Sequence, residues 1–132
     1  MDHSFRSALK ARFAKVLDFR TSFKEKINQI LHDPAYPQAQ REQFAKTQDG
    51  QYLANVNIHM KPVIDLIDVP YWHVKNTNGP AVVISALEEL KAALNAYAYT
   101  PTGDDPSTHM EAAMNIVDNV LTDDLQHLNT PE

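Results

Sequence analysis

The sequence predicts an all-α protein in which four helices pack as an antiparallel bundle. Three observations favour this fold. Apolar residues recur every three or four positions over long stretches, which is the spacing of one face of an α-helix. Only 3 of the 132 residues are glycine, whereas sandwiches and barrels need many tight turns. Proline-containing breaks divide the chain into four periodic segments, so helices are predicted at residues 4–31, 37–67, 80–99 and 106–128.

The first helix is predicted over residues 4–31, because its apolar side chains keep the helical spacing throughout this segment. The hydroxyl of Ser4 is suited to accept a hydrogen bond from a free N–H group of the first turn. Pro34 and Pro37 then end the helix, since neither has an N–H group and both disfavour helical backbone in the residue before them.

The second helix is predicted over residues 37–67 with a kink at Pro62. Proline has no N–H group, so Pro62 cannot donate to the carbonyl of Ile58 one turn earlier. The helical spacing of apolar residues nevertheless continues through this position to Ile67. This continuity favours one bent helix.

An α+β fold is the alternative, with strands near 51–60 and 69–75. Apolar and polar residues also alternate from Tyr52 to Met60, which is typical of a half-buried strand. The alternation ends at Met60, whereas the helical spacing does not, and the bundle is therefore preferred.

The third helix, at residues 80–99, follows an Asn-Gly-Pro turn at 78–80 that places proline at the first helical position. The fourth is predicted at 106–128, where Thr108 and Glu111 have the spacing of a capping box. The chain length fits a single domain spanning all 132 residues.

Charge is distributed unevenly along the chain. Residues 1–46 carry a net charge of +4, residues 47–91 carry −2 and residues 92–132 carry −7, which together give −5. Opposite charges on the first and last helices favour pairing between them. The acidic remainder of the chain repels phosphates and anionic headgroups, so we expect neither nucleic acid nor a membrane as partner.

No motif for catalysis or cofactor binding is found. The chain has no cysteine, so thiolate sites and disulfides are excluded. Its six histidines show none of the paired spacings that present metal ligands on a helix. Neither a nucleophile motif nor a glycine-rich phosphate loop is present. We therefore expect no catalytic residue, no metal and no cofactor.

The stretch PYWHVKNTNGP, residues 70–80, contains the single tryptophan and is predicted to form a loop. Flat aromatic groups with polar edges are enriched at the centres of binding surfaces. Tyr71, Trp72, His73 and Lys75 are therefore the candidate partner-binding residues. In the other interpretation Trp72 folds back and plugs the end of the bundle.

These observations predict a small, non-catalytic binding or regulatory protein of the cytoplasm that acts through protein–protein contacts. A homo-oligomer is left open. Bacterial immunity-type and phage accessory proteins are often built on small helical bundles, which is an analogy of fold alone. The alternative is an enzyme or small-ligand carrier with a site inside the bundle near Trp72, His73 and His59.

Overall fold

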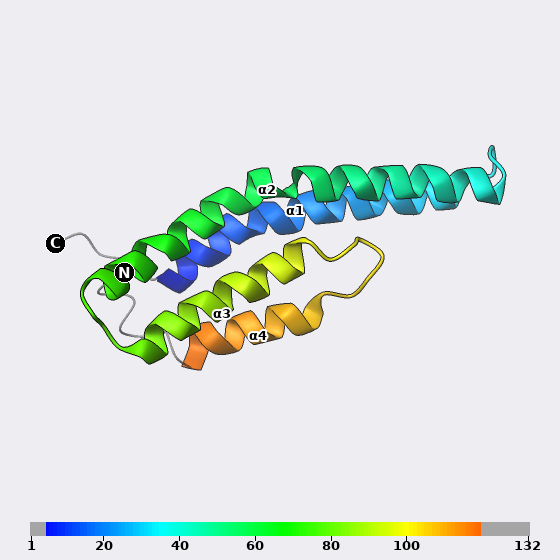
Figure 1. The fold of residues 1–132 in the computed structure, drawn as a ribbon. Coiled ribbons are helices and arrows are strands. Elements are labelled where there is room, and N and C mark those ends of the chain that lie inside the picture. Colours follow the sequence, from blue (N-terminus) through cyan, green and yellow to red (C-terminus); the bar gives the residue numbers. More distant parts are fainter. Residues whose placement is uncertain (1–4, 120–132) are drawn as a thin grey trace.

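The computed structural model describes residues 5–119, which form four α-helices and no strand (Figure 1). The predicted helical bundle is confirmed. The strands of the α+β alternative do not form, because 51–60 and 69–75 both lie within the second helix. The predicted extension of the last helix to residue 128 lies outside the described residues. The helices are α1 (Phe5–Leu31), α2 (Gln38–Asn76), α3 (Ala81–Ala98) and α4 (Ser107–Asn119).

Helix α2 contains two prolines and continues to Asn76, nine residues beyond its predicted end at Ile67. The predicted loop over residues 70–80 is therefore wrong as far as Asn76. Pro70, the first residue of that stretch, is buried inside α2, and so is Val74 one turn later. Continued burial of the inward face compensates for the single hydrogen bond that each proline removes. Figure 1 shows α2 bending in its middle. Pro62 lies inside this helix and has no N–H group for the carbonyl of Ile58, which is a known cause of helix bending.

A tight turn at residues 77–80 joins α2 to α3, as the Asn-Gly-Pro sequence predicted. Asn78 has a φ of 55°, the left-handed conformation that asparagine tolerates better than most residues. The Gly79 N–H donates to the carbonyl of Val74 at 2.8 Å and satisfies a terminal carbonyl of α2. The chain therefore reverses within a few residues, and α3 runs back along α2 (Figure 1).

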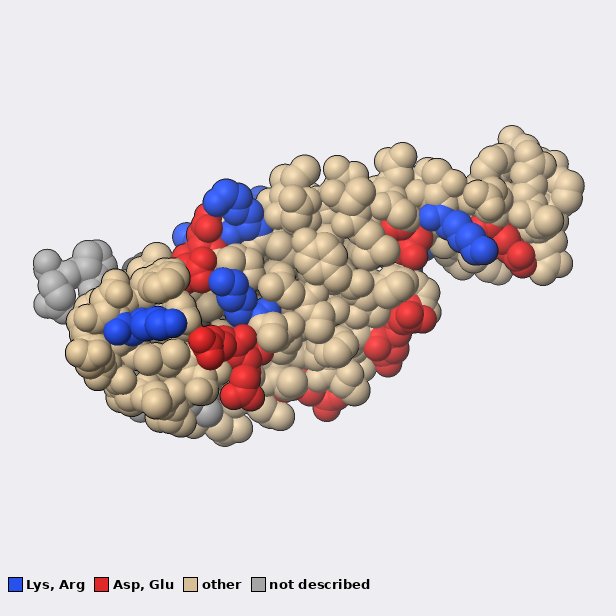
Figure 2. Space-filling model, in the orientation of Figure 1, with Lys and Arg blue, Asp and Glu red and all other residues tan. Residues whose placement is uncertain are grey.

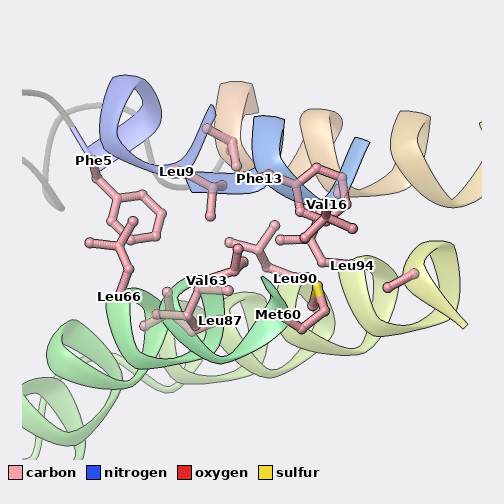
Figure 3. Packing of buried hydrophobic residues seen from close by; sticks show 14 of the residues in the cluster. Phe5, Leu9, Phe13, Val16, Met60, Val63, Leu66, Leu87, Leu90 and Leu94 are labelled. Atoms are coloured by element: carbon pink, nitrogen blue, oxygen red, sulfur yellow. The ribbon is translucent and has the colours of Figure 1, made fainter. Parts of the chain in front are cut away.

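The core lies where all four helices meet, and its side chains point inward from facing helices (Figure 3). Burial of each large apolar side chain contributes about 2 kcal/mol to the stability of the fold. The inward positions follow the three-four spacing seen in the sequence. They include Phe5, Leu9, Phe13 and Val16 of α1; Val56, Met60, Val63 and Ile67 of α2; Leu87, Leu90 and Leu94 of α3; and Ala113 and Val117 of α4.

Helices α1 and α2 are longer than α3 and α4, so part of the α1–α2 pair extends beyond the bundle (Figure 1). We call residues 21–51 the distal hairpin. Within it only Ala45 is buried. At its tip the rings of Tyr36 and Phe44 meet edge to face, with centroids 5.4 Å apart. Two helices alone cannot enclose apolar side chains, and most of the distal hairpin is accordingly polar and exposed.

Arg20 fixes the connection between α3 and α4. Its side chain is only 5% exposed. The guanidinium donates to the backbone carbonyls of Thr100, Pro101 and Asp104, and it also lies 3.4 Å from the hydroxyl of Tyr52. One residue of α1 thus satisfies three partly buried carbonyls that follow the end of α3.

Helix α2 holds the same connection from its other side. The carboxylate of Asp49 accepts hydrogen bonds from the N–H and the hydroxyl of Thr102, both at 2.9 Å. The Tyr52 hydroxyl donates to the carbonyl of Ala98. Burial raises the pKa of Tyr52, and the neighbouring Arg20 only partly opposes this shift. The connection is therefore anchored to both long helices.

Charges of opposite sign connect the first and last helices, as the charge distribution predicted. Arg6 of α1 lies 2.7 Å from the carboxylate of Asp118 in α4. On the face shown in Figure 2, basic and acidic side chains alternate with wide uncharged areas. Of the helices formed by residues 5–119, none combines the length and apolar character that crossing a bilayer requires.

Candidate partner-binding surface

Trp72 lies on the outer face of α2 and is 52% exposed, so it does not plug the end of the bundle. The helical register explains its position. The turn of α2 that directs Pro70 and Val74 into the core directs Val69 and Trp72 outward. Val69, three positions before Trp72, is 60% exposed.

Neighbouring side chains hold the exposed indole in place. The ring of Tyr71 meets that of Trp72 at an interplanar angle of 80°, with centroids 5.1 Å apart. The ammonium of Lys75 lies 5.6 Å from the Trp72 ring centroid and 5.3 Å from that of Tyr71. Edge-to-face and cation–π contacts of this kind favour one orientation of the indole.

A short hydrogen-bond chain links these residues to α3. The Lys75 ammonium donates to the Tyr71 hydroxyl at 3.1 Å, and this hydroxyl donates to the carboxylate of Glu88 at 2.9 Å. The hydrogen bond to Tyr71 raises the pKa of Lys75. A lysine is cationic at neutral pH even with its ordinary pKa, so Lys75 places a positive charge beside the indole.

A hollow of about 320 Å³ adjoins Trp72 between α2 and α3. The buried side chains of Ile67 and Leu87 contribute to its wall, while Glu88 and Lys91 add charged groups. Lys91 is itself paired with Asp68 of α2 at 3.0 Å. An apolar wall with charged neighbours is suited to receive an apolar side chain of a partner and to fix its orientation.

We call the exposed indole, its supporting side chains and the adjoining hollow the Trp72 surface. Of the four residues predicted from the sequence, the structure brings together Tyr71, Trp72 and Lys75. His73 is exposed on the same turn of α2, and it takes no part in the ring contacts and the hydrogen bond that join the other three. The remaining members of the surface were not predicted from the sequence, because they lie near Trp72 only when residues 69–76 are helical and pack against α3. These members are Val69, Ile67, Leu87, Glu88 and Lys91.

His59 does not join this surface. It precedes Trp72 by thirteen positions on α2, which corresponds to about 20 Å along a helix. Its ring instead packs against Phe19 of α1, with centroids 4.4 Å apart. Trp72, His73 and His59 are therefore not gathered into one interior site.

The groups that line the Trp72 surface are suited to recognition. In the part of the chain that the structure describes, no three His, Asp or Glu side chains are grouped so that they could hold a metal ion. The surface combines a fixed aromatic ring, an apolar hollow and charges of both signs, which are typical components of a protein-binding patch. Comparison of the chain with protein-family models, curated proteins and solved structures finds no match.

Proposed function

We propose that this chain is a small, non-catalytic binding or regulatory protein of the cytoplasm, and that it acts by docking a protein partner on the Trp72 surface. The observation that carries the proposal is the exposed but fixed indole. Trp72 is 52% exposed while Tyr71 and Lys75 hold its ring. A large ring that is already ordered loses little conformational entropy when a partner covers it.

The composition of the surface supports a protein as partner. Tryptophan, tyrosine and arginine dominate the residues that contribute most to protein–protein affinity, and they lie near the centre of the contact. Here Trp72 stands beside a hollow of about 320 Å³ that fits one apolar side chain. Lys75 and Glu88 border the aromatic pair and would complement charges at the edge of the contact.

Site-specific crosslinking in the host cell tests the proposal. A photo-crosslinking amino acid at Val69 of the full-length chain places the reactive group next to Trp72. We expect a discrete covalent adduct with a protein, either a different chain or a second copy. Trp72→Ala should abolish the adduct and weaken binding to the purified partner roughly 30-fold, the change typical of a central tryptophan.

Tyr99→Ala is the matched control. Tyr99 is also an exposed aromatic residue, at 44%, but it follows α3 at the far end from Trp72 (Figure 1). Its replacement should change the affinity less than about twofold. Equal loss of binding in both variants, or an adduct that persists in Trp72→Ala, contradicts the proposal.

A further inference from the structure

Helices α1 and α4 leave an apolar hollow between them. Its volume is about 330 Å³, and it lies at a different place from the Trp72 surface. Met110 and Met114 of α4 face Leu9, Phe13 and Leu17 of α1 across it. Methionine side chains are flexible and adapt to ligands of different shape. The hollow is thus an apolar site with one adaptable wall.

A second hollow, also of about 330 Å³, continues from the first along the same two helices. Leu17 and Met110 border both hollows, so these two side chains form the boundary between them. The lining of the second hollow is mixed: Leu17, Pro106 and Met110 are apolar, whereas Arg20, Lys24 and Asp105 add charged groups that the first hollow has only in Lys10. The two hollows are thus neighbours along the same helices, one apolar and one with charged groups, and we call the pair the α1–α4 groove, the first hollow its apolar end and the second its polar end.

The polar end carries an excess of positive charge. Arg20 and Lys24 both border it, and Asp105 is the one carboxylate among its lining residues. The buried Arg20 guanidinium hydrogen-bonds to backbone carbonyls and a tyrosine hydroxyl, so its charge has no hydrogen-bonded carboxylate. Asp105 accepts from the Ser107 N–H at 3.0 Å, and this bond lowers the pKa of its carboxyl. Two cations therefore face one carboxylate that already caps α4.

We infer that the α1–α4 groove binds a free fatty acid of medium chain length. Its acyl chain occupies the hollow between Leu9 and Met114, and its carboxylate lies at the polar end beside Lys24. Lys24 is exposed, and its charge already acts on the Asp105 carboxylate of the same hollow; its ammonium donates a charge-assisted hydrogen bond to the ligand, while Arg20 adds its charge from the wall. This inference is independent of the proposed protein contact.

Methyl NMR of the full chain tests the site directly. In protein labelled at the methionine methyl groups, monomeric decanoate should shift the Met110 and Met114 signals saturably, with one molecule bound per chain. Decan-1-ol should bind more weakly than decanoate, and decylammonium more weakly still, because the polar end repels a cationic head. Equal binding of decanoate and decylammonium, or shifts that never saturate, would overturn the inference.

Three lysine variants test the orientation of the ligand. Lys24→Gln should weaken decanoate binding about tenfold, the effect of losing one charge-assisted hydrogen bond. Lys26→Gln removes the same charge from the same helix outside both hollows and should have no effect. Lys10 borders the apolar end, and Lys10→Gln should change the affinity less than about twofold. A larger effect at Lys10 than at Lys24 contradicts the proposed orientation.

A variant that fills the apolar hollow and an assay with lipid vesicles further test fatty-acid binding in the α1–α4 groove. Met114→Phe places a bulkier ring in the apolar hollow and should reduce decanoate binding, whereas binding of a Trp72-surface partner should be unchanged. If this variant does not fold, the different effects expected for Lys24→Gln, Lys26→Gln and Lys10→Gln still test the inference. Cosedimentation with phosphatidylglycerol vesicles distinguishes a free fatty acid from a bilayer lipid. Binding to vesicles without saturable binding of decanoate would overturn the inference.

Discussion

Arg20 shows how a single buried cation is stabilised without a carboxylate. Its guanidinium spans several carbonyls just after the end of α3, where the helix dipole and unpaired carbonyl groups favour positive charge. The rings of Tyr52 and Tyr97 lie on either side, each 5.6 Å from the guanidinium carbon. Several partial negative charges thus replace one full negative charge.

We expect Arg20→Ala to lower the free energy of unfolding by about 3 kcal/mol, because the variant removes a buried side chain and the donor of three partly buried carbonyls. Arg20→Lys should restore little of this loss, since one ammonium cannot reproduce the planar fork of the guanidinium. Arg12→Ala is the control: Arg12 is exposed and donates one hydrogen bond to the Pro62 carbonyl at 2.9 Å. Urea unfolding followed by circular dichroism measures the three variants, and equal losses at Arg20 and Arg12 would refute this account.

At the scale of the elements, a glycine inside α2 and a glycine in the turn that follows it differ in the space around them. Gly50 lies within α2, and a Cβ atom there would meet no other atom within 4 Å. A Cβ at Gly79 in the α2–α3 turn would lie 2.5 Å from the Cγ1 of the buried Val74. The same substitution should therefore have opposite effects at the two positions.

Gly50→Ala should stabilise the protein by about 0.5–1 kcal/mol, because alanine restricts the unfolded chain and suits a helix interior. Gly79→Ala should destabilise it by about 1–3 kcal/mol, because Val74 must move to make room. Thermal unfolding of both variants provides the measurement. A stabilised Gly79→Ala would show that the turn does not approach Val74 as described, and a destabilised Gly50→Ala would question the continuity of α2.

The helices were largely predictable from apolar spacing, whereas the position of the candidate site was not. The spacing in residues 4–31 identified α1 because no proline interrupts it. Pro70 misled the sequence analysis, since local backbone preference suggested a loop while tertiary burial of Pro70 and Val74 keeps the chain helical. Tyr71, Trp72 and Lys75 were predicted as partner-binding residues from their chemistry alone. Their link to Glu88 depends on the packing of α2 against α3, which local sequence does not encode.

At the scale of the whole molecule, helix length divides the structure into two parts. The part where all four helices meet contains nearly all the buried side chains, whereas the distal hairpin, residues 21–51, buries only Ala45 (Figure 1). The α3–α4 connection, held by Arg20 and Asp49, lies near the boundary between these parts. Local stability should therefore be lower in the distal hairpin than in the four-helix part, because local unfolding costs less free energy where few apolar contacts are lost.

Hydrogen exchange measured by mass spectrometry on the full chain should therefore show a gradient along α2. We expect amides in residues 38–50 to exchange faster than those in 52–67, although both segments belong to one continuous helix. Arg20→Ala should accelerate exchange in the α3–α4 connection more than at the tip of the distal hairpin, because the lost hydrogen bonds end on Thr100, Pro101 and Asp104. Uniform protection along α2 would mean that the distal hairpin is covered in solution, and a second copy or another partner would then have to supply that cover.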